Sequence, residues 1–407
     1  MFLAAYQQVN DVPFFGHCFL RPVKPAFLMT RFQKLVYLLA LTVPAAAAAE
    51  TLVYLGTYTR GESKGIYRST LDEATGELSN PVIAAELENP SFLVVSPDQK
   101  YLFAVSENGR FKGEEGGGVS SFAIGKDGGL TLINQVNSGG GAPCHISTDP
   151  AGKSLLVANY MGGSTSSYQI TANGKLVSPA AGGFIQHEGQ GAQLPRQASP
   201  HAHSVNVDPS GKRAFVADLG LDKVLIYKLD AAAGTIASND QPFLKLPDAT
   251  GPRHFSFHPS GKWAYTNLEM SLQIAALSHD AKSGALKVLE IESTVPDGTE
   301  RKGNSTAECL VHPTGKWVYV SNRGHNSIAA FAIDQETGKL DFLERESTQG
   351  EIPRNFGIDP SGKFLIAGNQ RSDNVTVLKI NQDTGSLEPT GHEIIVPAAV
   401  CIRCLKR

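Results

Sequence analysis

The hydrophobic pattern of the chain is a series of short apolar runs, most of them preceded by a tight polar turn. The turn reads Pro-x-Gly-Lys, or Pro-Asp-Gln-Lys in its first copy, and successive copies lie 47 to 59 residues apart, beginning at Pro97, Pro150, Pro209, Pro259, Pro313 and Pro360. The runs that follow are rich in β-branched and aromatic residues, as in Trp317-Val-Tyr-Val-Ser-Asn322. Extended runs on both sides of such a turn predict a β-hairpin at each copy.

A second hairpin signal recurs with the same period. It is a turn built from Asp, Asn, Thr and Gly, as in Asp334-Gln-Glu-Thr-Gly-Lys-Leu340, and it occurs seven times. Two hairpins per repeat form a four-stranded antiparallel sheet, and a period of about 50 residues is typical of propeller blades. The sequence therefore predicts an all-β fold, a seven-bladed β-propeller of four-stranded antiparallel blades, as one domain over residues 50–407.

The apolar run Leu52–Tyr58 has no turn before it, so its blade lacks an inner strand. The chain ends in a second unpaired apolar stretch, from Glu393 to Ile402. An open sheet would leave exposed edges at both places. We therefore expect the N-terminal and C-terminal strands to pair and close the ring.

Residues 29–49 have the composition of a secretory signal peptide. A short basic segment begins at Met29, Leu35–Val43 is apolar, and Ala45–Ala49 offers a cleavage site before Glu50. The apolar run is shorter than the roughly 20 residues that span a bilayer. We expect residues 1–49 to be an N-terminal extension and signal peptide, and the mature protein to be periplasmic or secreted, with a cytoplasmic location as the alternative.

Charge and cysteine content exclude several function classes. A net charge of −3 does not indicate a surface for nucleic acid or anionic membranes. The four cysteines after residue 50 are too widely spaced for a disulfide framework, and Cys401-Ile-Arg-Cys404 lacks the second ligand pair that a zinc site needs. We expect a monomer with a small-molecule substrate, no metal, no nucleic-acid partner and no membrane attachment after signal cleavage.

Chemistry-bearing residues gather at one predicted mouth of the channel. In each blade the inner strand starts and the second strand ends at the mouth opposite the short turns, where the longer connections also lie, and loops on a rigid scaffold commonly carry binding residues. Equivalent positions on different blades converge around one axis. They carry histidines, arginines, carboxylates and one amide: His145, His201, His203, Arg253, His254, Glu269, Glu308, Arg323, His325, Arg354 and Gln370.

The longest repeat contains the Gly-rich segment Gly182–Gly191 followed by Arg196. We interpret it as a lid or pocket wall with Arg196 facing the axis; an ordinary surface insertion is the alternative. No serine-nucleophile signature is present. Cys144 and His145 are neighbours on a predicted strand, so their side chains should point to opposite faces and form no dyad. With these nucleophiles excluded, acid–base catalysis and electrostatic stabilisation are the kinds of chemistry that the residues can provide.

Several of these segments resemble one known family: Pro143-Cys-His145, Gln186-His-Glu-Gly189, Pro200-His-Ala-His203, Gly251-Pro-Arg-His254 and Ser321-Asn-Arg-Gly-His325. They are similar to the bacterial lactonase family of seven-bladed propellers, which includes propeller-type 6-phosphogluconolactonases and is related to carboxymuconate cyclases. The matches run through nearly all of residues 51–402. The resemblance implies a propeller, no cofactor and hydrolysis of a sugar lactone in carbohydrate metabolism, with 6-phosphogluconolactone as the family's substrate.

Position and chemistry suggest roles for the candidate residues. We predict that Glu308 or His254 is the base that activates water, and that the catalytic set is Glu308, His254, Arg253 and His145. We predict that the substrate, an anionic sugar lactone, is bound by Arg196, His201, His203, Glu269, Arg323, His325, Arg354 and Gln370. Because 6-phosphogluconolactone is cytoplasmic, an exported member could use an unphosphorylated lactone or another anion. The alternatives are a cycloisomerase of unsaturated dicarboxylic acids and a non-enzymatic propeller that binds a sugar acid.

Overall fold

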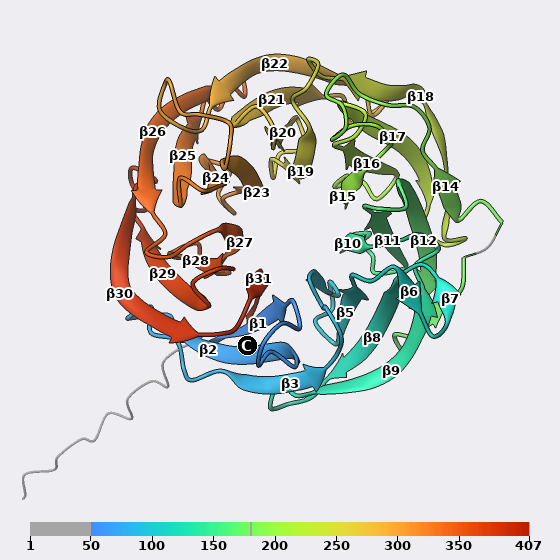
Figure 1. The fold of residues 1–407 in the computed structure, drawn as a ribbon, viewed down its shortest axis with the longest axis horizontal. Helices are drawn as coiled ribbons and strands as arrows, with labels where there is room; N and C mark the ends of the chain where they lie inside the picture. Colours follow the sequence, from blue (N-terminus) through green and yellow to red (C-terminus); the bar gives the residue numbers. More distant parts are fainter. Residues whose placement is uncertain (1–49, 180, 407) are drawn as a thin grey trace, which may run out of the picture. The chain divides into compact units, whose positions relative to one another are not determined.

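The computed structural model describes residues 50–179 and 181–406, and the predicted extension and signal peptide lie outside these residues. Seven blades of antiparallel strands surround a central channel, and no helix is present in the described part (Figure 1). We label the strands of each blade a to d from the channel outward. The prediction of a seven-bladed propeller with four-stranded blades is confirmed.

The inner strands a are β4 (Leu93–Val95), β10 (Pro143–Thr148), β15 (Ala202–Val207), β19 (Pro252–Phe257), β23 (Ser305–Val311), β27 (Pro353–Ile358) and β31 (Ala399–Lys406). Strands b are β5 (Tyr101–Ser106), β11 (Ser154–Asn159), β16 (Arg213–Asp218), β20 (Trp263–Leu268), β24 (Trp317–Arg323), β28 (Phe364–Asn369) and β1 (Glu50–Thr57). Three strands b are completely buried and the other four are buried except at one terminal residue, because each lies between two strands of its own sheet and between two blades.

Strands c are β8 (Gly118–Ile124), β12 (Ser164–Ile170), β17 (Lys223–Asp230), β21 (Gln273–His279), β25 (Ser327–Ile333), β29 (Asn374–Ile380) and β2 (Gly65–Asp72). The outer strands d are β9 (Leu130–Asn137), β18 (Thr235–Lys245), β22 (Leu286–Ser293), β26 (Leu340–Ser347), β30 (Leu387–Ile395) and β3 (Val82–Glu86). In the blade of β10, the outer position is shared by β13 (Leu176–Val177) and β14 (Phe184–Gln186), which both pair with β12. The hairpin β6 (Arg110–Phe111) and β7 (Glu114–Glu115) projects between β5 and β8.

The recurring turn motifs have a simple hydrogen-bond chemistry. Four of the c–d turns begin with an Asp whose Oδ1 accepts from the next backbone amides, as Asp334 does from Glu336 at 3.0 Å and Thr337 at 2.7 Å. Gly152 in an a–b turn has a φ of +66°, which a residue with a Cβ rarely adopts. The repeated Gly is therefore required by backbone geometry in this turn.

Neighbouring blades are joined by apolar clusters and by one recurring hydrogen bond. Tyr265 in β20 donates its hydroxyl to the carbonyl of Gly338 at 2.9 Å, and Tyr319 in β24 donates to Gly385 at 2.8 Å. In both cases the acceptor lies in the c–d turn of the next blade. This bond fixes each blade to its neighbour and so keeps the inner strands in register around the axis.

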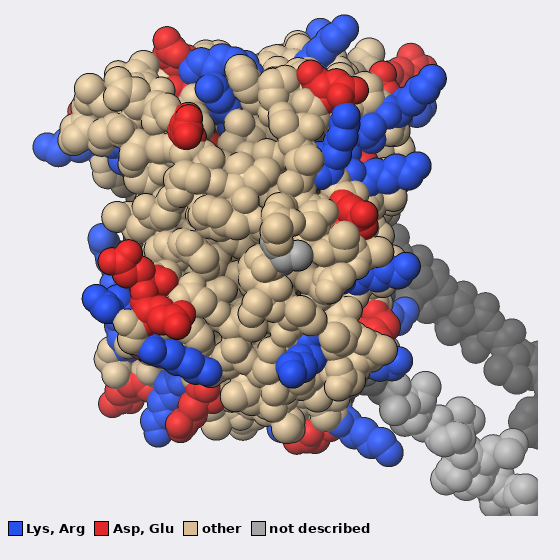
Figure 2. All heavy atoms as spheres, turned by 90° about the vertical axis from the view of Figure 1, so that its right-hand side faces the viewer, with Lys and Arg blue, Asp and Glu red and all other residues tan. Residues whose placement is uncertain are grey.

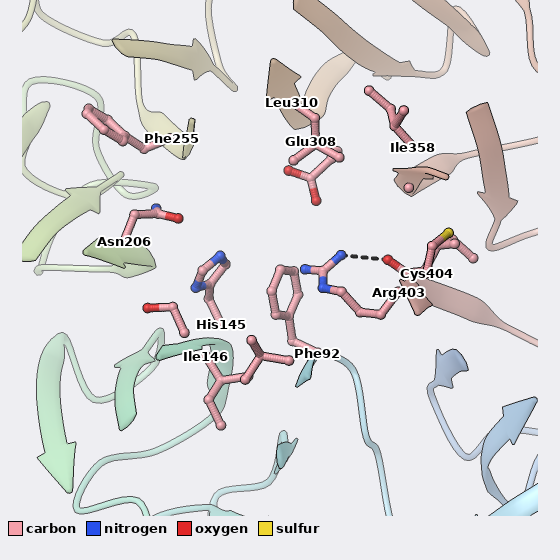
Figure 3. A pocket seen from close by; sticks show the side chains of 14 residues that line it. Phe92, His145, Ile146, Asn206, Phe255, Glu308, Leu310, Ile358, Arg403 and Cys404 are labelled. Atoms are coloured by element: carbon pink, nitrogen blue, oxygen red, sulfur yellow. Dashed lines mark hydrogen bonds between the residues drawn. The ribbon is translucent and has the colours of Figure 1, made fainter. Parts of the chain in front are cut away.

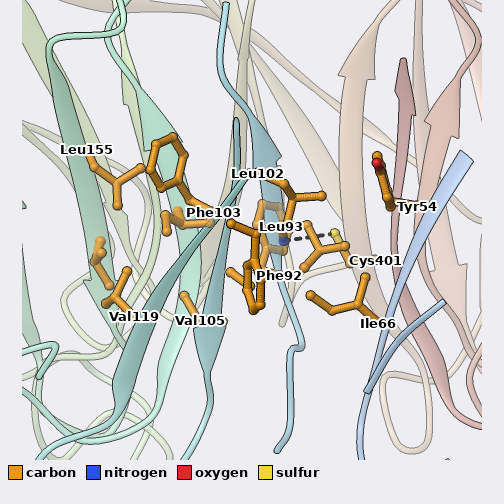
Figure 4. Packing of buried hydrophobic residues seen from close by; sticks show 14 of the residues in the cluster. Tyr54, Ile66, Phe92, Leu93, Leu102, Phe103, Val105, Val119, Leu155 and Cys401 are labelled. Carbon is orange, nitrogen blue, oxygen red and sulfur yellow. Dashed lines mark hydrogen bonds between the residues drawn. The ribbon is translucent and has the colours of Figure 1, made fainter. Parts of the chain in front are cut away.

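The ring closes between the two ends of the chain. Strand β1 pairs with β31 on one side and β2 on the other, which gives the sheet order β3-β2-β1-β31 and confirms the predicted closure. Figure 4 shows the adjoining core, in which Phe92 and Leu93 pack near Cys401 and the amide of Leu93 donates to the Cys401 Sγ at 3.3 Å. Residues more than 300 positions apart thus share one interface.

The outer surface agrees with the modest net charge. Figure 2 shows Lys and Arg interspersed with Asp and Glu around a broad area that carries neither kind of charge. No helix in the described part of the chain is long and apolar enough to cross a membrane.

Candidate active site

A chamber of about 210 Å³ lies where strands a begin and strands b end, and we call it the upper chamber. Its lining residues are polar, and five of the eight carry a formal charge: Glu107, Cys144, Tyr160, Arg196, His203, Glu269, Arg323 and Arg354. Five of the residues predicted from the sequence are among them. This mouth is the one predicted to hold the chemistry.

Glu269 is the centre of the arginine cluster. Its carboxylate forms ion pairs with Arg196 at 2.9 Å, Arg253 at 2.9 Å and Arg323 at 3.0 Å. Burial alone would raise the pKa of Glu269, but the charges of Arg323, Arg253 and Arg196 outweigh it and lower the pKa to about 2. Glu269 therefore holds the arginines in place as a permanent carboxylate.

Arg253 is buried behind the chamber wall, next to Glu269. It is 1% exposed and donates to the carbonyl of Ala307 at 2.5 Å, and it is absent from the chamber lining. Burial and the nearby charges of Arg323 and Arg354 lower its pKa to about 9. The predicted direct catalytic role of Arg253 is thus not favoured by its position.

Arg354 presents its charge to the chamber. Its Nη2 donates to the hydroxyl of Tyr58 at 2.9 Å, and that hydroxyl donates to Glu107 at 2.9 Å. Arg354 lines the chamber, and none of the ion pairs in the described residues includes it. Three arginines and two carboxylates, Glu107 and Glu269, line the chamber, and the buried Arg253 adds a fourth cation beside Glu269, so the site has an excess of positive charge.

His203 is the imidazole that lines the upper chamber. Burial, followed by the charge of Arg253, lowers its pKa well below the ordinary value of 6.5, so the ring is neutral near neutral pH. Its Nδ1 lies 3.7 Å from the Sγ of Cys144. Burial raises the pKa of Cys144, which keeps it a neutral thiol and a poor nucleophile. A neutral imidazole beside an arginine cluster can accept a proton from water.

The remaining predicted catalytic residues, His254, Glu308 and His145, do not line the upper chamber and lie further along the channel. His254 donates from Nδ1 to Glu308 at 2.6 Å, and its ring packs against His203 and His145 with centroid distances of 5.4 and 5.3 Å. Glu308 and His145 line a second, lower chamber of about 340 Å³ on the side of the a–b turns (Figure 3). The predicted set is therefore divided between two depths rather than gathered at one mouth.

Backbone bulges explain this division. A β-bulge lies near the start of five inner strands, where the pairing with strand b shifts register. These strands are β10, β15, β19, β23 and β27. In β10 the extra residue is Cys144, and it lines the upper chamber while His145 lines the lower one. The bulge interrupts the regular alternation of side chains, and the Sγ of Cys144 lies near the Nδ1 of His203. That Cys144 and His145 form no dyad stays a prediction.

Three predicted binding residues lie outside both chambers. His201 stacks on Tyr160 with a centroid distance of 4.6 Å and bonds to its carbonyl. His325 contacts the hydroxyl of Ser327 at 2.8 Å. Gln370 lines a separate hollow with Arg60 and Arg371. His201 lies at the edge of the arginine cluster, since Arg196 bonds to the Tyr160 on which it stacks, whereas His325 and Gln370 contact other parts of the molecule.

The Gly-rich segment carries Arg196 into the chamber wall. β14 within it pairs with β12, His187 bonds to Asp218 at 2.7 Å, and Gln197 donates to Asp222 at 2.8 Å. Arg196 reaches Glu269 and also bonds to the hydroxyl of Tyr160. The predicted pocket wall agrees with this placement.

Glu107, Tyr160 and Cys144 are chamber residues that were not among the predicted site residues. Glu107 and Tyr160 occupy the same position as Glu269 and Arg323, the seventh residue counted from the start of strand b. The position of a residue within the repeat could therefore have identified Glu107 and Tyr160 as chamber residues. No group of three or more His, Cys, Asp and Glu side chains among the described residues could hold a metal ion.

Comparison with known proteins places the chain in a family. The family model described as lactonase, 7-bladed beta-propeller, matches residues 52–404. The 6-phosphogluconolactonase of Bacillus subtilis is 36% identical over 309 residues, which cover 75% of this chain and 84% of that protein.

Solved structures of similar proteins support the same family. The periplasmic gluconolactonase of Pseudomonas aeruginosa is 33% identical with a TM-score of 0.81, covering 88% of this chain and 99% of that one. A protein from Bacteroides fragilis is 30% identical with a TM-score of 0.82, covering 89% and 100%. With the propeller and its arginine-lined chamber described above, these matches show that the chain belongs to the lactonase family of seven-bladed β-propellers.

Proposed function

We propose that the upper chamber hydrolyses a sugar lactone that carries an anionic group. The chain is a lactonase by family, and relatives are named 6-phosphogluconolactonase and gluconolactonase. The observation that carries the choice of substrate is the excess of arginine over carboxylate around the chamber. A phosphate or carboxylate on the lactone would balance that charge.

The proposed roles follow from position. Arg354 binds the anionic group, Arg323 polarises the lactone carbonyl, and Glu269 positions Arg196, Arg253 and Arg323. His203 accepts a proton as the water oxygen adds to the carbonyl carbon. The ring C–O bond then breaks, and the proton passes to the ring oxygen, which leaves as a hydroxyl group. The product is the open-chain hydroxy acid.

Three lactones test this proposal: 6-phosphogluconolactone, glucarolactone, which carries a carboxylate, and uncharged gluconolactone. We expect the purified mature protein to hydrolyse an anionic lactone with the highest kcat/KM after correction for spontaneous hydrolysis. We expect Arg354→Leu to lower kcat/KM for that lactone by about ten- to hundredfold, because a charged hydrogen bond contributes about 1.5–3 kcal/mol. The effect on gluconolactone should be small.

Arg371→Leu is the matched control, since this arginine is exposed and lines a different hollow. It should leave all three rates unchanged. Equal rates on the three lactones with no loss in Arg354→Leu would contradict the anionic substrate. No rate above the spontaneous one on any lactone would contradict the activity itself.

We also propose that the mature protein is exported. The support is the signal-peptide composition of residues 29–49 and the periplasmic location stated in the name of the Pseudomonas aeruginosa relative. Cell fractionation with N-terminal sequencing should recover the protein outside the cytoplasm with a chain that begins near Glu50. A cytoplasmic chain that still carries residues 29–49 would refute export.

A further inference from the structure

The lower chamber is a second cavity that the proposed reaction does not use. It is lined by residues further along the inner strands than those of the upper chamber, from at least five blades. Its rim residues Val94, Ser147, Asn206 and Leu310 are only partly buried, so solvent reaches it from the mouth of the a–b turns. A volume of about 340 Å³ is that of a small-ligand site.

The walls combine apolar surface with hydrogen-bond donors. Apolar side chains from several blades face the cavity, namely Phe92, Val94, Ile146, Phe255, Leu310, Ile358 and Ile402. The Nδ1 of His145 accepts from the amide of Val205 at 3.3 Å. In the neutral ring that burial favours, Nε2 therefore carries the proton and is a donor. The hydroxyl of Ser147 has no hydrogen-bond partner among the described residues.

Glu308 contributes little open acceptor capacity to this cavity. Its Oε1 accepts from the Nδ1 of His254 at 2.6 Å and from the amide of Cys309 at 2.9 Å. Its Oε2 accepts from the side-chain amide of Asn355. All three partners are hydrogen-bond donors that belong to the protein wall, so they use acceptor positions of the carboxylate that a ligand would otherwise reach.

Arg403 provides the open charge. It donates from Nε to the carbonyl of Leu93 at 2.8 Å and from Nη1 to that of Ile402 at 2.6 Å, and its guanidinium lies 4.3 Å from the ring centroid of Phe92. These contacts fix the group so that it reaches toward the middle of the cavity (Figure 3). No ion pair in the described part of the chain includes Arg403.

We propose that the lower chamber binds a small monocarboxylate with an apolar skeleton. The carboxylate is held by Arg403, and the skeleton contacts the apolar wall. The N–H groups of Arg403 that are not bound to Leu93 and Ile402 need an acceptor, and the apolar side chains around them favour a ligand with few hydroxyl groups. This site is separate from the upper chamber and does not depend on the lactonase reaction.

Benzoate is a suitable probe, and benzamide is its uncharged analogue of the same shape. Isothermal titration calorimetry on the full mature protein should show saturable binding of benzoate at one site, and binding of benzamide at least tenfold weaker. Arg403→Leu should weaken benzoate binding at least tenfold. Ile358→Trp, which fills the cavity without removing a charge, should also abolish it.

Arg354→Leu is the matched control, because it removes an arginine from the upper chamber only. It should leave benzoate binding unchanged. Loss of binding in Arg354→Leu with retention in Arg403→Leu would place the probe in the upper chamber and overturn the proposal. Equal binding of benzoate and benzamide, or no saturable binding by the folded wild type, would overturn it as well. Near-native circular dichroism of each variant ensures that weakened binding is not unfolding.

Discussion

Glu269→Gln is expected to destabilise the protein by about 3 kcal/mol at pH 7. The substitution keeps the shape of the side chain but removes the negative charge that faces Arg196, Arg253 and Arg323. Arg253 is almost completely buried, so its charge would remain without a counter-charge, and removal of one partner of a buried pair costs about 3–5 kcal/mol. Urea unfolding of wild type and variant gives the difference in the free energy of unfolding.

The titration of Glu269 determines how the stability difference between wild type and Glu269→Gln depends on pH. The pKa of Glu269 is about 2 in the folded protein, against an ordinary value of 4.5. A lowered pKa means that the stabilisation is fully present above pH 4.5 and is lost as the pH falls toward 2. The shift corresponds to about 3 kcal/mol. The gap between wild type and Glu269→Gln should therefore narrow from pH 5 downward.

Glu388→Gln is the matched control, because Glu388 is exposed on the outer strand β30. It should change the free energy of unfolding by less than about 0.5 kcal/mol. If Glu269→Gln were as stable as this control at pH 7, the three arginines would not depend on the carboxylate, and the account of the cluster would be wrong.

His203→Gln should lower kcat by about 10²- to 10⁴-fold with a small change in KM, since a positioned general base contributes that much. His201→Gln provides a control two residues away in the chain. His201 stacks on Tyr160 outside the chamber lining, so its replacement should leave kcat nearly unchanged. Equal losses in both variants, or wild-type turnover in His203→Gln, would assign the proton transfer elsewhere.

The pH profile of kcat/KM tests the same residue. Burial and the charge of Arg253 lower the pKa of His203 well below 6.5. A base with a lowered pKa stays unprotonated to lower pH, so the rate should persist at pH 6.5 and decline only in more acidic solution. A decline centred at pH 6.5 or above would indicate a base in a different environment.

The fold could be predicted almost completely because its signals are local and repeated. Most a–b turns carry Gly at positive φ, most c–d turns begin with a capping Asp, and the alternation between them fixes strand length. Closure by the two chain ends followed from counting unpaired strands. None of these inferences needed side-chain packing at long range.

The depth of each site residue could not be predicted, because it depends on the bulges of the inner strands. Cys144, His203 and Arg354 are the extra residues at these bulges, and all three line the upper chamber. Each bulge interrupts the regular alternation of side chains that an undisturbed strand would show. A bulge leaves no sequence signature here, since its stabilising contacts come from other strands, as when Asn267 accepts from the amide of His254 at 2.9 Å.

The pairing of β1 with β31 determines the order in which the molecule can be completed. Thr51 lies opposite Lys406, so the first described strand finds its inner neighbour only after the last one has been synthesised. Six blades can assemble from segments that are contiguous in sequence, but the seventh cannot. Its contacts have the largest sequence separation in the chain, and such contacts form slowly. The newly made protein thus passes through a stage in which a nearly finished ring still has one unprotected strand edge.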